Sequence, residues 1–96
     1  MITSSQIMEQ KDYLTRAIFK VLPYKEEGYE DLDKYFEFLI QRLNSFNCII
    51  NSQPVIVTVI SLIKYAQTEN DFKKFRKAIL DACGLIQGIK EGDVNV

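Results

Sequence analysis

Apolar residues recur at helical spacing in four segments of the chain, and polar residues fill the positions between them. Residues three and four positions apart share one face of an α-helix, so this pattern predicts four amphipathic helices. The expected helices span about residues 5–22, 29–47, 54–67 and 71–87, followed by a tail over residues 88–96. Short connectors place consecutive helices side by side and antiparallel. We therefore expect an all-α, antiparallel up-down four-helix bundle that forms one domain over residues 1–96.

The first segment combines a start signal, an apolar stripe and a stop signal. Thr3 and Gln6 have the spacing of a capping box, and Pro23 is expected to end the helix because a residue before proline avoids the α region. Residues 23–28 are then a polar connector. The expected buried stripe consists of Ile7, Leu14, Ile18 and Val21, widened by Met8, Ala17, Phe19 and Leu22. The charged residues that fall mostly outside the stripe are Lys11, Asp12, Arg16 and Lys20.

The second segment has carboxylates in its first turns, where they favour the positive end of the helix dipole. Its expected buried stripe consists of Leu32, Tyr35, Phe36, Leu39, Leu43 and Phe46. A helical projection places Phe38 on the opposite side, between Asp31, Lys34 and Ser45. Two interpretations of Phe38 stay open: its ring folds onto a neighbouring helix, or it contacts a partner.

Residues 52–67 form the most apolar segment and are rich in β-branched side chains. A strand there would be apolar on both faces and would need a partner strand, for which the chain has no candidate. As a helix, the segment has Pro54 at its first position, where proline is tolerated, and Thr58, Ser61 and Lys64 on its polar side. Burial of large apolar side chains, about 1.5–3 kcal/mol each, outweighs the helix propensity cost. We expect a central buried helix.

The fourth segment opens at a turn in which Asn70 or Asp71 can cap a helix. Its expected buried residues are Phe72, Phe75, Ile79, Ala82, Cys83 and Ile86. The residues expected on the opposite face are Lys73, Lys74, Lys77 and Asp81. Gly88 is a candidate C-cap.

Composition excludes several classes of function. The chain has 96 residues, a net charge of −1 and no histidine, so the commonest general base and metal ligand is missing. Cys48 and Cys83 form no CxxC pair, and two reduced, apolar thiols are favoured over a disulfide. The longest apolar run, from Val55 to Ile63, is far below the ~20 residues of a membrane span, and the first residues lack a secretory signal. We expect a cytoplasmic protein without enzymatic activity, cofactor, metal or small-molecule substrate.

A surface that binds a partner is the remaining candidate for function. The densest cationic cluster is on the fourth segment, and such a cluster either is a solvated helix face or contacts phosphates or an anionic membrane. The net charge and the lack of interleaved aromatic residues do not favour nucleic acid. In order, the candidate partner-binding residues are Lys73, Lys74 and Lys77, then Lys90, Glu91 and Asp93 of the tail, and then Phe38.

Several sequence features follow one another along nearly the whole chain. They begin with a KEEGYEDL connector into the second helix, an LIQRL stretch near its end and an Asn/Ser-rich loop before Pro54. An apolar third helix that ends at Tyr65, a TEND turn and a fourth helix that contains phenylalanines complete the series. This order of features resembles the enterocin A immunity family, which protects bacteria from pediocin-like (class IIa) bacteriocins.

The resemblance implies a cytoplasmic four-helix bundle, peripheral at the inner face of the membrane, that binds the bacteriocin-occupied mannose phosphotransferase permease and blocks its lethal pore. It also implies that the C-terminal half determines which bacteriocin is countered. The alternative is a small helical adaptor or regulator that binds another protein or nucleic acid. The sequence specifies neither the cognate bacteriocin nor the oligomeric state.

Overall fold

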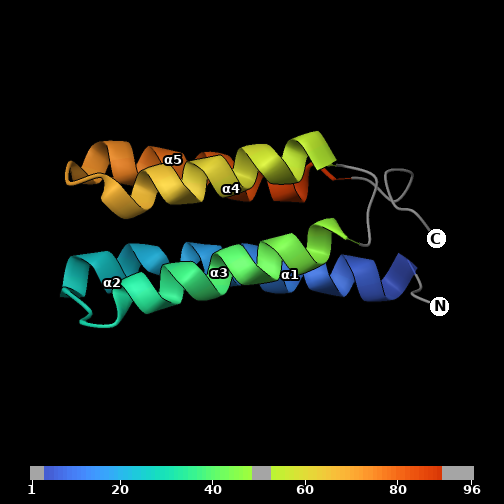
Figure 1. The fold of residues 1–96 in the computed structure, drawn as a ribbon, viewed down its shortest axis with the longest axis horizontal. Helices are drawn as coiled ribbons and strands as arrows, with labels where there is room; N and C mark the ends of the chain where they lie inside the picture. Colours follow the sequence, from blue (N-terminus) through green and yellow to red (C-terminus); the bar gives the residue numbers. More distant parts are fainter. Residues whose placement is uncertain (1–3, 49–52, 90–96) are drawn as a thin grey trace.

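The structure, a computed structural model, describes residues 4–48 and 53–89, and this part of the chain is all-helical and contains no strand (Figure 1). The helices are α1 (Ser4–Phe19), α2 (Val21–Glu27), α3 (Leu32–Asn47), α4 (Gln53–Thr68) and α5 (Phe72–Gln87). The predicted all-α class is thus confirmed. The predicted third and fourth helices agree with α4 and α5 to within one residue at each end.

Helices α1 and α2 form one rod that is interrupted at Lys20. The Lys20 N–H donates to the Arg16 carbonyl at 3.1 Å, and the Tyr24 N–H donates to the Lys20 carbonyl at 3.3 Å. The prediction that Pro23 ends the first helix is wrong, because α2 continues to Glu27. The interruption places Pro23 in the first turn of α2, where a missing N–H removes no helical hydrogen bond.

Gly28 ends this rod in the left-handed conformation, with φ 69° and ψ 39°. The Tyr29 N–H then donates to the Tyr24 carbonyl at 3.0 Å, as in the Schellman arrangement of a helix end. The predicted connector over residues 23–28 is therefore helical up to Glu27, and the predicted helix start at Tyr29 is three residues too early. Asp31 is the N-cap of α3.

Alanine at Gly28 should destabilise the protein by about 1–2 kcal/mol, because a Cβ disfavours the left-handed conformation. No heavy atom beyond the neighbouring residues lies within 4 Å of that Cβ, so the cost is purely conformational. The matched control is Gly84→Ala inside α5, where space is also open and alanine should stabilise by about 0.5–1 kcal/mol. Urea unfolding measures both changes in the free energy of unfolding. A change of the same sign in the two variants would contradict the left-handed conformation of Gly28.

The α1–α2 rod and the single helices α3, α4 and α5 make four rods. Each rod packs against two others, so that the four form a closed ring. The most extensive packing joins α4 to α5, followed by α1 to α5, α3 to α4, and α1 to α3. In Figure 1, α4 and α5 lie side by side, and α1, α2 and α3 lie together below them. The result is an elongated molecule with extents of 40 × 20 × 16 Å.

Burial in α4 settles the choice between strand and helix that its sequence posed. Ile56, Val59, Ile63 and Ala66 have no exposed surface, as expected for the central apolar side of a helix. The side chains on the predicted polar side, Thr58, Ser61, Lys64 and Tyr65, are exposed. Hydrophobic burial has overridden the strand propensity of this segment.

The core also includes buried residues from α1, α3 and α5, with an edge-to-face pair of Phe36 and Phe75 near one end of the molecule. Most of the predicted α1 stripe is buried. Met8 and Phe19, which were predicted to widen it, are 45% and 51% exposed, because they lie at its edge. Cys83 is buried, Cys48 is exposed, and both thiols are free, so Cys48 is not the core residue that the sequence favoured.

None of the described helices combines the length and the hydrophobicity that a bilayer crossing requires.

Candidate functional site

The outer face of α5 carries three of the candidate partner-binding residues. Lys73, Lys74 and Lys77 are all exposed, whereas Phe75 and Ile79 on the other side of the helix are completely buried. This placement follows from the amphipathic pattern of α5.

The start of this face is fixed by a helix cap. The Lys73 N–H donates to Oδ1 of Asp71 at 3.1 Å, so Asp71 is the N-cap of α5, as one of the two sequence alternatives proposed. The cap orients the first turn of α5, in which Lys73 and Lys74 lie.

The charges on the α5 face are partly paired. Nζ of Lys77 lies 2.9 Å from Oδ2 of Asp81, one helical turn away. Lys73 and Lys74 form no ion pair with any residue in the described part of the chain. A shallow hollow of about 430 Å³ on this face is lined by Phe72, Lys73, Arg76, Lys77, Leu80 and Asp81. The face can therefore offer cations together with apolar contact area to an anionic partner.

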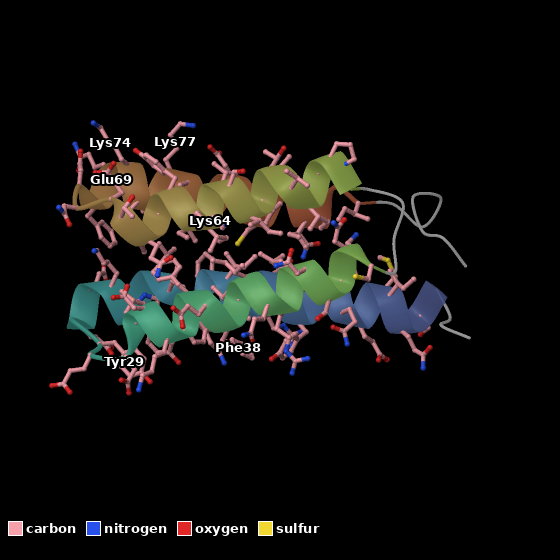
Figure 2. The ribbon with its side chains drawn as sticks, in the orientation of Figure 1. Tyr29, Phe38, Lys64, Glu69, Lys74 and Lys77 are labelled. Atoms are coloured by element: carbon pink, nitrogen blue, oxygen red, sulfur yellow. The ribbon has the colours of Figure 1, made fainter. Side chains whose placement is uncertain are left out.

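The turn between α4 and α5 is held by Glu69. Its carboxylate accepts a hydrogen bond from the Tyr65 hydroxyl at 2.7 Å and another from the Asp71 N–H at 3.0 Å. These two bonds, the backbone one first, lower the pKa of Glu69, and the nearby Lys74 acts in the same direction. The bond to Glu69 raises the pKa of Tyr65. Figure 2 shows Glu69 at the same end of the molecule as Lys74 and Lys77.

Glu69→Gln should reduce the loss of stability in acid. A carboxylate whose folded-state pKa is lowered stabilises the protein above its unfolded pKa of about 4.5, and this contribution is lost as the pH falls through the lower folded-state pKa. Thermal midpoints at pH 6 and pH 3 should therefore differ less for Glu69→Gln than for the parent protein. Glu37→Gln, an exposed change on α3, is the matched control. Identical pH dependence in all three proteins would contradict the role of Glu69.

Phe38 lies on the opposite side of the molecule from Lys74 and Lys77, so the structure does not bring these candidates together (Figure 2). Its ring is half-buried and packs against the core. The ring centroid of Phe38 is 5.7 Å from that of Tyr35, and the Arg42 guanidinium lies 5.5 Å from it. Of the two sequence interpretations, the structure supports packing against the core, and part of the Phe38 side chain stays accessible.

The tail candidates Lys90, Glu91 and Asp93 lie outside the described residues. The residue before them, Ile89, is buried, and its carbonyl accepts a hydrogen bond from Nζ of Lys11. Nζ of Lys11 also donates to the Gln87 carbonyl at 3.2 Å. Lys11 thus satisfies carbonyl groups that the end of α5 leaves without a helical partner, and its positive charge favours that end of the helix dipole.

The sequence prediction for Lys11 was therefore wrong, because its side chain is 5% exposed instead of lying outside the stripe. A signal existed: Lys11 follows Ile7 by four residues and precedes Leu14 by three, so it occupies a stripe position. A lysine in that position predicts a buried polar partner. The carbonyl groups of α5 could not be identified without the fold.

A second feature that sequence reasoning missed lies between α1 and α3. The Cζ atom of Arg42 is 5.8 Å from the ring centroid of Tyr13 on α1 and 5.5 Å from that of Phe38. The i, i+4 spacing of Phe38 and Arg42 was the available signal, but the contribution of Tyr13 depends on the packing of α1.

The remaining reactive groups offer no further site. Burial raises the pKa of the Cys83 thiol to about 11, which keeps it protonated and unreactive at neutral pH. Within residues 4–48 and 53–89, no group of three or more side chains with metal-binding atoms comes together.

The chain was compared with models of protein families, with curated proteins and with solved structures, and none of the three comparisons found a match.

Proposed function

We propose that this protein is an antiparallel, up-down four-helix bundle that acts as a bacteriocin immunity protein. In this proposal it binds the mannose phosphotransferase permease occupied by a pediocin-like bacteriocin, from the cytoplasmic side, and keeps the pore closed. The order of the four rods supports the bundle: consecutive rods are neighbours, and the last packs against the first. The reversal of the chain direction between α4 and α5, visible in Figure 1, also supports it.

The positions of the family-like sequence features support the same proposal. The KEEGYEDL connector contains Gly28, which ends α2, and Asp31, which occupies the N-cap position of α3. Pro54 is the second residue of α4, and the TEND turn supplies Asp71 as the cap of α5. The features that resemble the enterocin A immunity family thus lie at helix boundaries, where they set the lengths of the rods.

The observation that carries the proposal is the exposed cationic face of α5. It belongs to the C-terminal half, which determines specificity in the family that the sequence resembles. Lys73 and Lys74 have no ion-pair partner among the described residues, and the hollow beside them combines charge with apolar surface. An anionic leaflet attracts a basic group near its surface by about 1 kcal/mol, which favours a location at the inner face of the membrane.

Affinity capture from membranes tests the proposal. The tagged protein is incubated with membranes of a strain sensitive to pediocin-like bacteriocins, with and without the bacteriocin. We expect permease subunits to be recovered when the bacteriocin is present. Recovery of an unrelated soluble partner regardless of bacteriocin, or of no permease, would contradict the proposal and favour a helical adaptor.

Charge reversal locates the binding face in the same assay. Lys73→Glu with Lys77→Glu should abolish capture and leave the thermal midpoint nearly unchanged. The first change puts a carboxylate at the positive end of the α5 dipole, which is favourable. The second replaces an exposed ion pair with Asp81, worth about 0.3–0.5 kcal/mol, by a like-charge contact of similar size. Lys34→Glu with Lys64→Glu alters the net charge equally on other helices and should leave capture intact. Equal loss in both double variants would contradict a role for α5.

A further inference from the structure

The groove between α1 and α3 contains an arginine whose hydrogen-bond donors are not paired with any residue in the described part of the chain. Arg42 is exposed, its guanidinium lies against the rings of Tyr13 and Phe38, and it makes no hydrogen bond or ion pair with another described residue. Aromatic rings hold a guanidinium by cation–π attraction and restrict its rotation. Its N–H edge then remains available for a carboxylate, which it can bind through two parallel hydrogen bonds.

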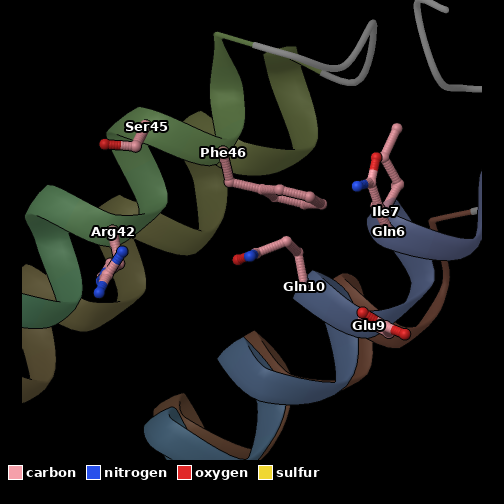
Figure 3. Close-up of a pocket in the computed structure, with 7 residues that line it drawn as sticks. All are labelled: Gln6, Ile7, Glu9, Gln10, Arg42, Ser45 and Phe46. Carbon is pink, nitrogen blue, oxygen red and sulfur yellow. The ribbon is translucent and has the colours of Figure 1, made fainter. Parts of the chain in front are cut away.

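Two hollows of similar size, about 420 Å³ each, lie on either side of Arg42 along the groove. Figure 3 shows the first, into which Phe46 extends from α3 and Gln10 from α1. Its lining consists of Gln6, Ile7, Glu9, Gln10, Arg42, Ser45 and Phe46. The lining of the second consists of Tyr13, Arg16, Ala17, Lys20, Tyr35 and Phe38. Each hollow therefore has an apolar floor and a polar rim.

The two hollows follow one another along α3, within the reach of a single bound helix. Phe38 and Ser45, which line different hollows, are seven residues apart on α3, so they are separated by two turns or about 11 Å. Helices that bind in grooves present apolar anchors at the same i, i+7 spacing. Arg42 lines the first hollow, next to Tyr13 and Phe38 of the second, and would face a residue three or four positions after the first anchor.

We propose that this groove binds an amphipathic helix of a partner protein, with one apolar side chain in each hollow and a carboxylate between them on Arg42. The packing of the rods is consistent with this, because α1 and α3 make the least extensive contact of the four neighbouring pairs. A third helix laid along their shared groove would cover Tyr13, which is 44% exposed, and the accessible part of Phe38.

The distribution of charge selects a peptide over a polyanion. Arg16 is already paired with Asp12 at 2.7 Å, so Arg42 and Lys20 supply the free positive charge of the groove. Glu9 also lines the first hollow and repels a continuous line of phosphates. A partner helix with one central carboxylate and a neutral or basic end beside Glu9 complements this pattern. A nucleic acid or an anionic membrane does not.

This inference does not depend on the proposed immunity function, because the groove lies on a different part of the surface from the α5 lysines. It assigns the molecule a second interaction surface. If the peptide does not bind to the groove, the proposed role of the α5 lysines still stands, and if the permease is not captured, the proposed role of the groove still stands.

Peptide binding followed by NMR tests the inference. The probe is an alanine-rich helical peptide of about sixteen residues, with two leucines seven positions apart and a glutamate four positions after the first leucine. We expect amide shifts in the labelled protein at Tyr13, Phe38 and Arg42. Replacing the glutamate of the probe with lysine should weaken binding at least about tenfold, as expected for the loss of a charged hydrogen bond.

Variants of the protein provide the matched controls. Arg42→Gln should weaken binding of the glutamate probe about tenfold. The thermal midpoint of this variant should stay within a few degrees of that of the parent protein, since Arg42 is exposed. Arg76→Gln, on the α5 face, should bind normally. No binding at about 1 mM probe, equal binding of the lysine probe, or shifts confined to α5 would overturn the inference. Displacement of the probe by a single-stranded oligonucleotide or by anionic vesicles would overturn it in favour of a polyanion site.

Discussion

Phe75→Ala is expected to lower the free energy of unfolding by about 3–5 kcal/mol, the largest effect of any single truncation considered for this chain. The Phe75 side chain is completely buried, and its ring meets Phe36 edge to face, with centroids 6.2 Å apart and an interplanar angle of 88°. The Lys25 ammonium group also lies 5.3 Å from the centre of the ring. Truncation to alanine removes the buried ring, its contact with Phe36 and its contact with Lys25, and leaves a cavity between α3 and α5.

Urea unfolding of Phe75→Ala measures this loss. Phe72→Ala is the matched control, because Phe72 is half-exposed and stacks on Phe75 at a centroid distance of 6.0 Å. The control should lose less than half as much stability. Since small domains are stable by roughly 5–15 kcal/mol, the Phe75 variant should be close to unfolding at physiological temperature. Similar losses in the two variants would contradict the complete burial of Phe75 in the core.

Lys11→Met is expected to lower the thermal midpoint by roughly 5–20 °C. Methionine fills the same space but cannot donate to the carbonyl groups of Gln87 and Ile89. Buried acceptors left without a partner cost about 1–3 kcal/mol, which for a domain of this size corresponds to several degrees per kcal/mol. The helix dipole also loses a favourable cation at the end of α5.

Calorimetry together with amide hydrogen exchange checks the Lys11 prediction. Amide exchange should become faster in the last turn of α5 and change less in α3, because the lost hydrogen bonds are at the C-terminal end of α5. Lys20→Met is the control, since Lys20 is exposed and forms no ion pair with a described residue. An unchanged midpoint, or an equal effect in the control, would show that Lys11 does not hold the end of α5.

Lys11 also illustrates the limit of prediction from sequence. Apolar spacing predicted the buried sides of α3, α4 and α5, because helix geometry alone decides which residues share a face. It could not predict that a lysine in the stripe would reach the carbonyl groups of a helix 76 residues further along. That contact depends on how α1 and α5 are placed relative to each other.

The rod formed by α1 and α2 shows a similar limit at the level of the backbone. Pro23 is a strong stop signal, but an interruption at Lys20 restarts the helix and makes proline a first-turn residue. The true end is Gly28, which the sequence places in a connector without indicating its left-handed conformation. Local signals predicted where a boundary could be, and the packing of α2 against α3 and α5 decided where it is.

The candidate surfaces divide in the same way. The exposed lysines of α5 could be predicted, because they lie opposite an apolar stripe on one helix. The groove around Arg42 could not, because it needs Tyr13 from α1 and Phe38 from α3. A surface built by two helices becomes visible once their packing is known.

Survival of a sensitive strain measures the proposed immunity most directly. Cells that express this protein are exposed to a panel of pediocin-like bacteriocins, beside cells with an empty vector and cells that express the Lys73→Glu, Lys77→Glu variant. The proposal predicts higher survival against at least one bacteriocin with the parent protein and killing at the vector level with the variant. The proposal would be contradicted if every bacteriocin of the panel killed cells that express the folded parent protein as effectively as cells with the empty vector.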